Sequence, residues 1–355
     1  MISSILAPIF VFAVVVIVHE GGHFLMAKWT GMKVIEFAVG FGPVIVSKKW
    51  GETLYSLRLI PLGGFNKIAG MDDQNKDDPR AFNQRPTWAK LLVIVGGALF
   101  NVLLALLIFI SAFKIEGYNT FPNLPKVGTV LAGSSAEKQH LSPGDTILSI
   151  EGKAMVKWTD IGEALKEKGN RVVSMEIDHE GATRQVTIIP EVQPDGRAIM
   201  GITPYVEHHE TTMTEAIAMG FGRAADLLHM MTAGLYDMVT GTGRAEVSGP
   251  IGIARMSGEV ASYGVMPLFM FIALLSLNLG LLNILPVPLL DGGHLILILL
   301  EAILGRQLPE KALIYIQSVG IAILGAIFFY ALFHDISELR SEEHTSELQS
   351  HPSIS

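Results

Sequence analysis

Four segments of the chain are apolar over the length that a membrane-spanning helix requires. About 20 mostly apolar residues in a helix cross the hydrocarbon core of a bilayer, because each residue adds about 1.5 Å. The four predicted spans cover residues 6–27, 91–113, 268–285 with a continuation to 290, and 312–333. A signal-peptide core is the alternative for the first span, but no small-residue cleavage site follows it. The pattern therefore predicts an α-helical membrane protein.

Two other segments have the pattern of β-structure. Residues 53–60 alternate between apolar and polar side chains, as a strand does, and turn signals follow at Pro61 and Gly63-Gly64. They predict a β-hairpin that is either inserted in the membrane or only packed on its surface. Beyond residue 126, short β-rich runs separated by turns predict a soluble α/β insert. Its expected strands cover residues 127–131, 146–150, 171–177 and 185–189, and its expected helix covers residues 158–168.

One further helix completes the predicted domain organisation. Residues 214–239 have one apolar and one polar face, so this helix is expected either on the outer membrane surface or against the soluble insert. The chain then divides into five regions. They are the first two spans with the hairpin loop (1–113), the insert (114–200), a linker with the amphipathic helix (201–265), the last two spans (266–339) and a tail (340–355).

Composition agrees with a membrane protein and narrows its chemistry. Half of the 355 residues are apolar, 17% are charged, and the mean hydropathy is +0.43. The absence of cysteine excludes disulfides and thiolate metal sites, and the net charge of −8 without a basic patch gives no sign of nucleic-acid binding. Lys and Arg gather in residues 28–90 and again at Arg306 and Lys311, so both loops are predicted to be cytoplasmic and the insert to lie outside.

The end of the chain differs in character from the rest. Residues 340–350 resemble the translation of a common sequencing-library adapter. The alternative is an ordinary polar tail. In both cases the region 340–355 is left out of the predicted fold.

A metal-binding pattern stands at the end of the first apolar segment. The run His19-Glu20-Gly21-Gly22-His23 has the HExxH form, in which two histidines four positions apart share one face of a helix. Both can hold one metal ion, and Glu20 can take a proton from water beside it. Ionisable groups are costly at membrane depth, which favours a functional site over a chance pentapeptide.

A carboxylate after the third apolar segment is the candidate for a third ligand. A catalytic zinc usually has three protein ligands and one open position. Asp291 ends the run NILPVPLLD, which also contains Asn283, Pro286 and Pro288, and it lies at the same predicted membrane depth as the HExxH motif. The prolines free backbone carbonyls, which a membrane tolerates only where protein or a cavity covers them. Taken alone, the run is more typical of a simple helix stop, with Asp291 in a loop at the membrane surface.

Together these motifs resemble the site-2 protease family of intramembrane zinc metalloproteases, and its bacterial RseP/RasP group in particular. The resemblance rests on HEGGH in the first span, on GALFN in the second and on NILPVPLLDGG in the third. The stretches 40–43, 60–65 and 248–252 also look like that group. Nearly the whole chain to about residue 339 is covered. The resemblance implies a zinc metalloendopeptidase of the bacterial cytoplasmic membrane.

The resemblance also implies roles for single residues. Three residues are the implied ligands of Zn²⁺, namely His19, His23 and Asp291. Three others are implied to meet the substrate helix beside the metal, namely Asn283, Pro286 and Pro288. Glu20 is the implied general base. Asn101 either supports the active site or only joins two helices, and His294 either contacts the ligands or is a helix-entry residue at the interface.

The insert resembles a PDZ domain of the bacterial protease type, in residues 133–136 and 141–152. Such a domain either adds an extended peptide as a strand, near residues 127–131, or excludes substrates with large external domains. The implied partners are the lipid bilayer and single-span membrane proteins already shortened outside, such as anti-sigma factors or signal-peptide remnants. The predicted fold class is four transmembrane helices with a membrane-associated β-hairpin plus one extracytoplasmic α/β PDZ domain.

Two rival functions make different predictions. A binding protein that holds membrane substrates through the insert needs no zinc and is insensitive to changes at Glu20. A metal transporter would move ions across the membrane of a vesicle. That hypothesis does not explain why the carboxylate of Glu20 lies beside the metal. The complete HExxH and Asp291 set argues against both. Nitrogen and carboxylate ligands suit zinc, although such a set also accepts iron or cobalt.

Overall fold

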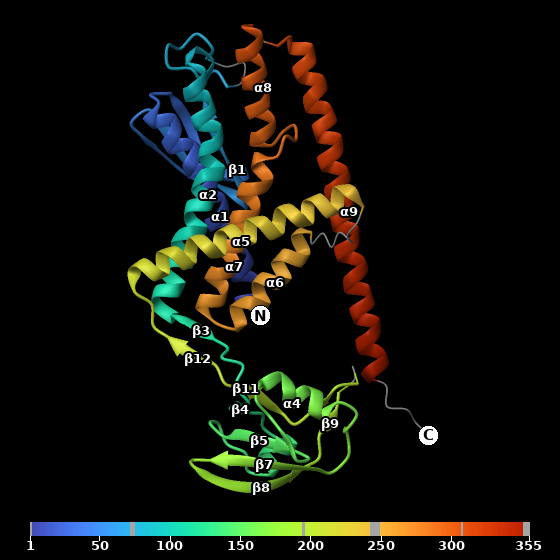
Figure 1. Cartoon of the computed structure of the whole chain (residues 1–355). Coiled ribbons are helices and arrows are strands. Elements are labelled where there is room, and N and C mark those ends of the chain that lie inside the picture. Colours follow the sequence, from blue (N-terminus) through green and yellow to red (C-terminus); the bar gives the residue numbers. More distant parts are fainter. Residues whose placement is uncertain (1, 72–74, 194–195, 242–248, 307, 351–355) are drawn as a thin grey trace. The chain divides into compact units, whose positions relative to one another are not determined.

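The computed structural model describes residues 2–71, 75–193, 196–241, 249–306 and 308–350 (Figure 1). The chain forms two compact units, one made of Met1–Phe113 with Met213–Ser355 and the other of Lys114–Thr212. Ser248, which belongs to a stretch that carries the family resemblance, lies outside the described residues, as do residues 351–355 of the predicted tail.

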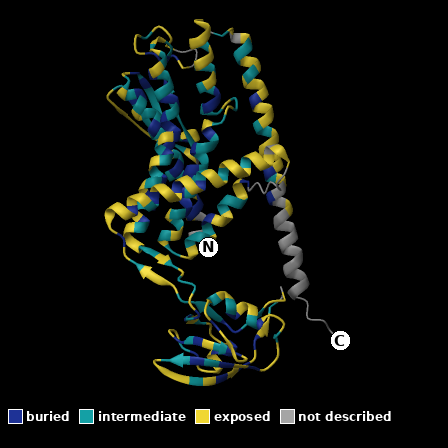
Figure 2. Ribbon diagram, in the orientation of Figure 1, coloured by how far each residue is buried: buried dark blue, intermediate teal, exposed yellow. Residues whose placement is uncertain are grey.

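Among the described residues, four helices are long and apolar enough to cross a membrane, which confirms the predicted spans. The candidate spans are Leu6–Trp29 within α1 (Ile2–Trp29), all of α2 (Thr87–Glu116), all of α7 (Val265–Ile284) and Lys311–Phe333 within α9 (Glu310–Ser350). Figure 2 shows exposed residues along these helices. Large apolar side chains are among them, such as Leu107 and Phe333. Such a surface suits hydrocarbon rather than water.

The third span ends earlier than the apolar run suggested. α7 stops at Ile284 and does not continue to residue 290, and a separate helix, α8 (Asp291–Leu304), begins at Asp291. Because proline lacks a backbone N–H and clashes with the preceding turn, Pro286 and Pro288 prevent a continuous helix. The helix of the fourth span is longer than predicted. α9 continues to Ser350 and includes most of the predicted tail.

The core of the first unit joins α1, α2 and α7 to a helix that follows the insert. This helix, α5 (Met213–Thr240), confirms the amphipathic helix predicted at residues 214–239. One buried apolar cluster includes Val11, Phe109, Leu227 and Ile272, one from each of the four helices. Figure 1 shows α5 running across α2 and α7 rather than along them. The apolar face of α5 therefore packs on the membrane helices of its own unit.

A buried carboxylate joins α6 (Pro250–Ser262) to α9. Asp335 of α9 is 3% exposed and accepts hydrogen bonds from the backbone N–H groups of Gly249, Ile251 and Gly252, at 2.9, 3.1 and 3.0 Å. The first N–H groups of a helix have no partner within the helix and carry partial positive charge. The carboxylate therefore caps α6 and holds its start against α9.

The segment between α1 and α2 forms a small sheet. β1 (Val34–Trp50) and β2 (Thr53–Ile68) pair antiparallel, and residues 53–60 are a strand as their alternation predicted. The register sets residues 53–58 against 44–50, residues 54–57 also against 36–39, and residues 64–68 against 34–39. Each long strand thus contributes two segments. They are separated near Gly40 (φ 89°) in β1 and near Gly63 (φ 129°) in β2, where glycine tolerates positive φ.

The second unit contains a four-stranded antiparallel sheet in the order β6-β5-β7-β8, around a core that includes Ile147 and Ile177. Its strands are β5 (Thr146–Ile150), β6 (Lys153–Ala154), β7 (Val173–His179) and β8 (Ala182–Ile188), and its helices are α3 (Ser135–Lys138) and α4 (Trp158–Leu165). Three strand pairs complete it: β3 (Tyr118–Thr120) with β12 (Glu207–His209), β4 (Val127–Val130) with β11 (Ile202–Pro204), and β9 (Glu191–Val192) with β10 (Ala198–Ile199). The strands and the helix predicted for the insert are confirmed within a few residues.

Candidate metal centre

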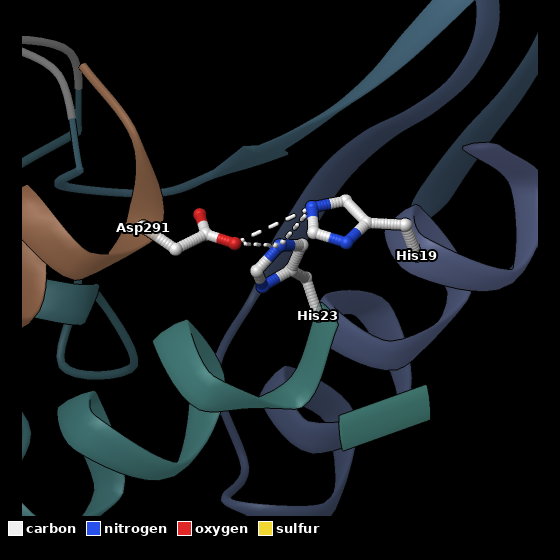
Figure 3. Close-up of side chains that lie close together, drawn as sticks. All are labelled: His19, His23 and Asp291. Atoms are coloured by element: carbon white, nitrogen blue, oxygen red, sulfur yellow. Dashed lines mark hydrogen bonds and ion pairs between the residues drawn. The ribbon is translucent and has the colours of Figure 1, made fainter. Parts of the chain in front are cut away.

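Helix α1 directs two imidazoles to the same point. His19 and His23 are one helical turn apart, and their Nε2 atoms lie 3.2 Å from each other (Figure 3). Both side chains are nearly buried, at 10% and 12% exposure. The helical period alone brings them together, as the HExxH spacing predicted.

The third group comes from the far end of the sequence. Asp291 is the first residue of α8, and its Oδ2 atom lies 3.3 Å from the Nε2 atom of each histidine (Figure 3). The chain reverses sharply before this point. A Cβ on Gly292 would collide with the carbonyl oxygens of Ile284 and Leu285, and only glycine allows so close a return. The break in α7 and the glycine together aim the carboxylate at the histidines.

The three groups fit a zinc ion. Zinc bonds of about 2.0–2.1 Å at tetrahedral angles keep two ligand atoms about 3.3–3.4 Å apart, and the three separations here are 3.2, 3.3 and 3.3 Å. The Oδ2 atom of Asp291 is buried and has no hydrogen-bond partner in the described part of the chain. A buried carboxylate oxygen without a partner is costly, and a cation would offset that cost. Within the described ranges this is also the one group of three His, Cys, Asp or Glu side chains placed to hold a metal.

Neighbouring groups set the orientation of both imidazoles. The Nδ1 atom of His23 lies 2.8 Å from the carbonyl oxygen of Val93. Because a carbonyl only accepts, Nδ1 carries the hydrogen and Nε2 keeps its lone pair for a metal. The Nδ1 atom of His19 lies 3.4 Å from the side-chain amide of Asn101, whose backbone oxygen accepts a bond of 2.9 Å from Ser276. Asn101 therefore contacts a candidate ligand and also joins α2 to α7.

Glycines let α2 lie directly behind the two histidines. A Cβ on Gly97 would collide with the imidazoles of His19 and His23, and a Cβ on Gly22 would collide with the backbone of Gly96. The two helices can approach this closely only where side chains are missing. The GALFN stretch thus contributes a glycine that makes room for the site, which sequence patterns alone did not reveal.

A cavity of about 280 Å³ opens beside the three groups, and it is large enough for several water molecules or a short stretch of peptide. Glu20, Asn66 and His294 line it together with the candidate ligands. The Oε2 atom of Glu20 accepts a hydrogen bond of 2.8 Å from the Nδ2 atom of Asn66 on β2. The candidate base therefore faces the same space as the metal centre. His294 shares that space without being one of the three grouped ligands.

The structure separates the three residues predicted to meet the substrate. Asn283 lines the cavity, and its Nδ2 atom lies 3.4 Å from the Nε2 atom of His19. Pro286 and Pro288 are not among the residues that line the cavity, and Pro288 instead packs against Gly320 of α9. Their visible effect is to end α7 before Asp291. A direct contact of either proline with substrate stays a prediction.

Asn66 is the polar residue of the cavity lining that sequence reasoning missed. Its one signal was an amide side chain directly after the Gly63-Gly64-Phe65 run, in a segment interpreted as a turn. In the structure that segment is the last part of β2 and lies beside α1. Only the pairing of residues 64–68 with 34–39 brings Asn66 to Glu20.

Comparison with known proteins agrees with these motifs. A profile of peptidase family M50 matches residues 7–327. A predicted zinc metalloprotease of Clostridium acetobutylicum is 32% identical over 94% of this chain and 97% of its own length. The regulator of sigma-W protease RasP of Bacillus subtilis is 28% identical over 95% of this chain and 99% of its own. The PDZ domain of an SdrC-like protein of Listeria monocytogenes covers 24% of this chain and 90% of its own, at 23% identity and a TM-score of 0.22. The chain belongs to peptidase family M50.

Proposed function

We propose that this protein is an intramembrane zinc metalloendopeptidase that cuts the transmembrane segments of single-span membrane proteins. The observation that carries the proposal is the convergence of His19, His23 and Asp291 beside Glu20, in a cavity between helices apolar enough to span a membrane. The zinc metalloprotease name of the Clostridium acetobutylicum relative, which matches along nearly its whole length, supports the same activity.

The chemistry follows from the residues around the cavity. His19, His23 and Asp291 would hold Zn²⁺, which supplies Lewis-acid chemistry for the attack of water on a peptide carbonyl. Glu20 accepts the proton of the attacking water and then transfers it to the leaving amine. Asn283, next to His19, is placed to donate a hydrogen bond to the peptide as it is attacked.

The sheet between α1 and α2 offers a way to open a substrate helix. A transmembrane helix protects its amides by its own hydrogen bonds, so cleavage requires local unwinding. In the part of the chain that the structure describes, residues 64–68 pair on one side only, with residues 34–39, and four of them line the cavity. An unwound substrate can add to this free edge as an extra strand. Exposed Ile45, Val46 and Leu59 suit insertion of the sheet into lipid.

The proposal also includes the substrates of the protein and its orientation in the membrane. We infer that substrates are proteins already shortened outside, such as anti-sigma factors or signal-peptide remnants, and the name of the Bacillus subtilis relative supports the first of these. The Lys and Arg residues between α1 and α2 favour a cytoplasmic side for the active site in a bacterial cytoplasmic membrane. The insert would then lie outside, as a PDZ domain that binds a peptide or acts as a size filter.

Cleavage of a single-span reporter without an external domain tests the proposal. Purified protein in detergent is expected to cut the reporter, to lose activity with a zinc chelator and to regain it when zinc is added back. The same reporter with a bulky folded external domain measures the size filter. A zinc-bound protein that cuts neither reporter nor a natural anti-sigma factor would favour the binding-protein alternative, and metal flux into vesicles would favour a transporter.

A further inference from the structure

The free edge of β2 approaches the catalytic helix at Glu20. Gly64 and Asn66 are two positions apart in the strand, so their side-chain positions point to the same face. A Cβ on Gly64 would lie 3.0 Å from the Cγ atom of Glu20. The side-chain amide of Asn66 donates a hydrogen bond to the carboxylate of Glu20. The strand therefore leaves room for Glu20 at Gly64 and forms a hydrogen bond to it from Asn66.

The orientation of the Asn66 amide is fixed by its partners. Its Nδ2 atom donates to the backbone oxygen of Glu20 at 2.7 Å and to the Oε2 atom of Glu20 at 2.8 Å. A carbonyl and a carboxylate are both acceptors, so the nitrogen must face them and the Oδ1 atom must point away. That Oδ1 atom is buried and has no hydrogen-bond partner within the described ranges.

We infer that Asn66 is a positioning residue for Glu20 and that its Oδ1 atom accepts a backbone N–H of the bound substrate strand. The inference rests on the proposed peptidase function. A glutamate with a free side chain samples several rotamers, and the two bonds from one amide limit it to the rotamer that faces the cavity. Asn66 lines the cavity, its Oδ1 atom is buried and unpaired, and an unwound peptide in the cavity would offer N–H donors to it.

The hydrogen bond between Asn66 and Glu20 would limit cleavage to unwound chains. Asn66 belongs to the edge segment to which a substrate strand would add, and it also holds the base. A strand that bonds to the Oδ1 atom therefore lies next to a base already in position. A helical substrate, with its N–H groups paired internally, cannot make this bond.

Two substitutions separate the two roles of the amide. Asn66→Asp keeps the size and an acceptor oxygen but removes the donor to Glu20, so kcat is expected to fall at least tenfold while KM stays within about twofold of wild type. Asn66→Ala removes both groups, so kcat is expected to fall by a similar factor and KM to rise at least threefold. Both variants are measured with the single-span reporter, and both are expected to keep one zinc per chain.

A matched amide on the same loop provides the control. Asn83 donates to the carbonyl oxygen of Lys76 and does not line the cavity, so Asn83→Asp and Asn83→Ala are expected to keep kcat and KM within twofold of wild type. A kcat of Asn66→Ala within twofold of wild type would overturn the inference, as would a fall that only follows loss of zinc. Wild type is assayed alongside. If it binds zinc but does not cut, the proposed function fails as well, and that result is distinct from an active wild type with an unaffected Asn66→Ala.

Discussion

Replacing Glu20 with glutamine is expected to abolish peptide cleavage while zinc stays bound. Glutamine has the same shape and can still accept the hydrogen bond from Asn66, but it cannot take a proton. Loss of a general base typically lowers the rate by about 10²–10⁴-fold. We therefore expect kcat of the variant to fall by a factor in this range or by a larger one. Reporter cleavage and zinc per chain are measured on the same preparation.

A glutamate in the turn between β1 and β2 controls for the removal of a carboxylate. Glu52 pairs with Lys28 and Arg80 at the protein surface, and these bonds lower its pKa. Glu52→Gln is expected to leave kcat within twofold of wild type, because exposed ion pairs contribute little. Equal activity of Glu20→Gln and wild type would contradict the assigned role of Glu20.

Adding a single methyl group at Gly97 is expected to destroy the metal centre. A Cβ at this position would collide with both imidazoles, and the helices cannot separate without moving His19 and His23 away from Asp291. The three ligand atoms already lie at the separations that zinc requires, so a shift of either helix takes them out of that geometry. Gly97→Ala should therefore lose most of its zinc and its cleavage activity together, while the protein still inserts into membranes.

The HExxH motif itself contains the matched control. Gly21 lies on the same helix, within two positions of both histidines, and a Cβ there would meet nothing within 4 Å. Gly21→Ala is expected to keep its zinc, its activity and, because alanine is the better helix former, slightly more stability. Zinc content equal to wild type in Gly97→Ala, or a loss of zinc as severe in Gly21→Ala, would show that the crossing of α1 and α2 does not shape the site.

The parts of the site that follow a local rule could be predicted from sequence. The i, i+4 spacing places His19 and His23 on one face of a helix whatever surrounds them. Span lengths follow from bilayer thickness, and the predicted spans agree with the helices apart from their ends. Asp291 could be predicted as a ligand because two prolines end the third span just before it, at the membrane depth of the first motif.

The parts that depend on contact between distant segments could not be predicted. Asn66 is linked to Glu20 through a sheet in which two long strands each bend into two segments, and no local pattern encodes that register. Gly97 matters because of what lies opposite it on α1, which a single sequence does not show. The extent of the third span was wrong for a related reason, since apolar residues after Ile284 continue a hydropathy signal while the prolines determine the backbone.

The metal content of the purified protein, compared with that of Asp291→Ala, tests the central claim most directly. The claim is that His19, His23 and Asp291 hold one zinc ion. Wild type is expected to contain about one zinc per chain, and Asp291→Ala is expected to contain almost none, with the exposed Asp226→Ala equal to wild type. Zinc content in Asp291→Ala equal to that of wild type would contradict the claim, because the metal would then be held without the carboxylate that completes the site.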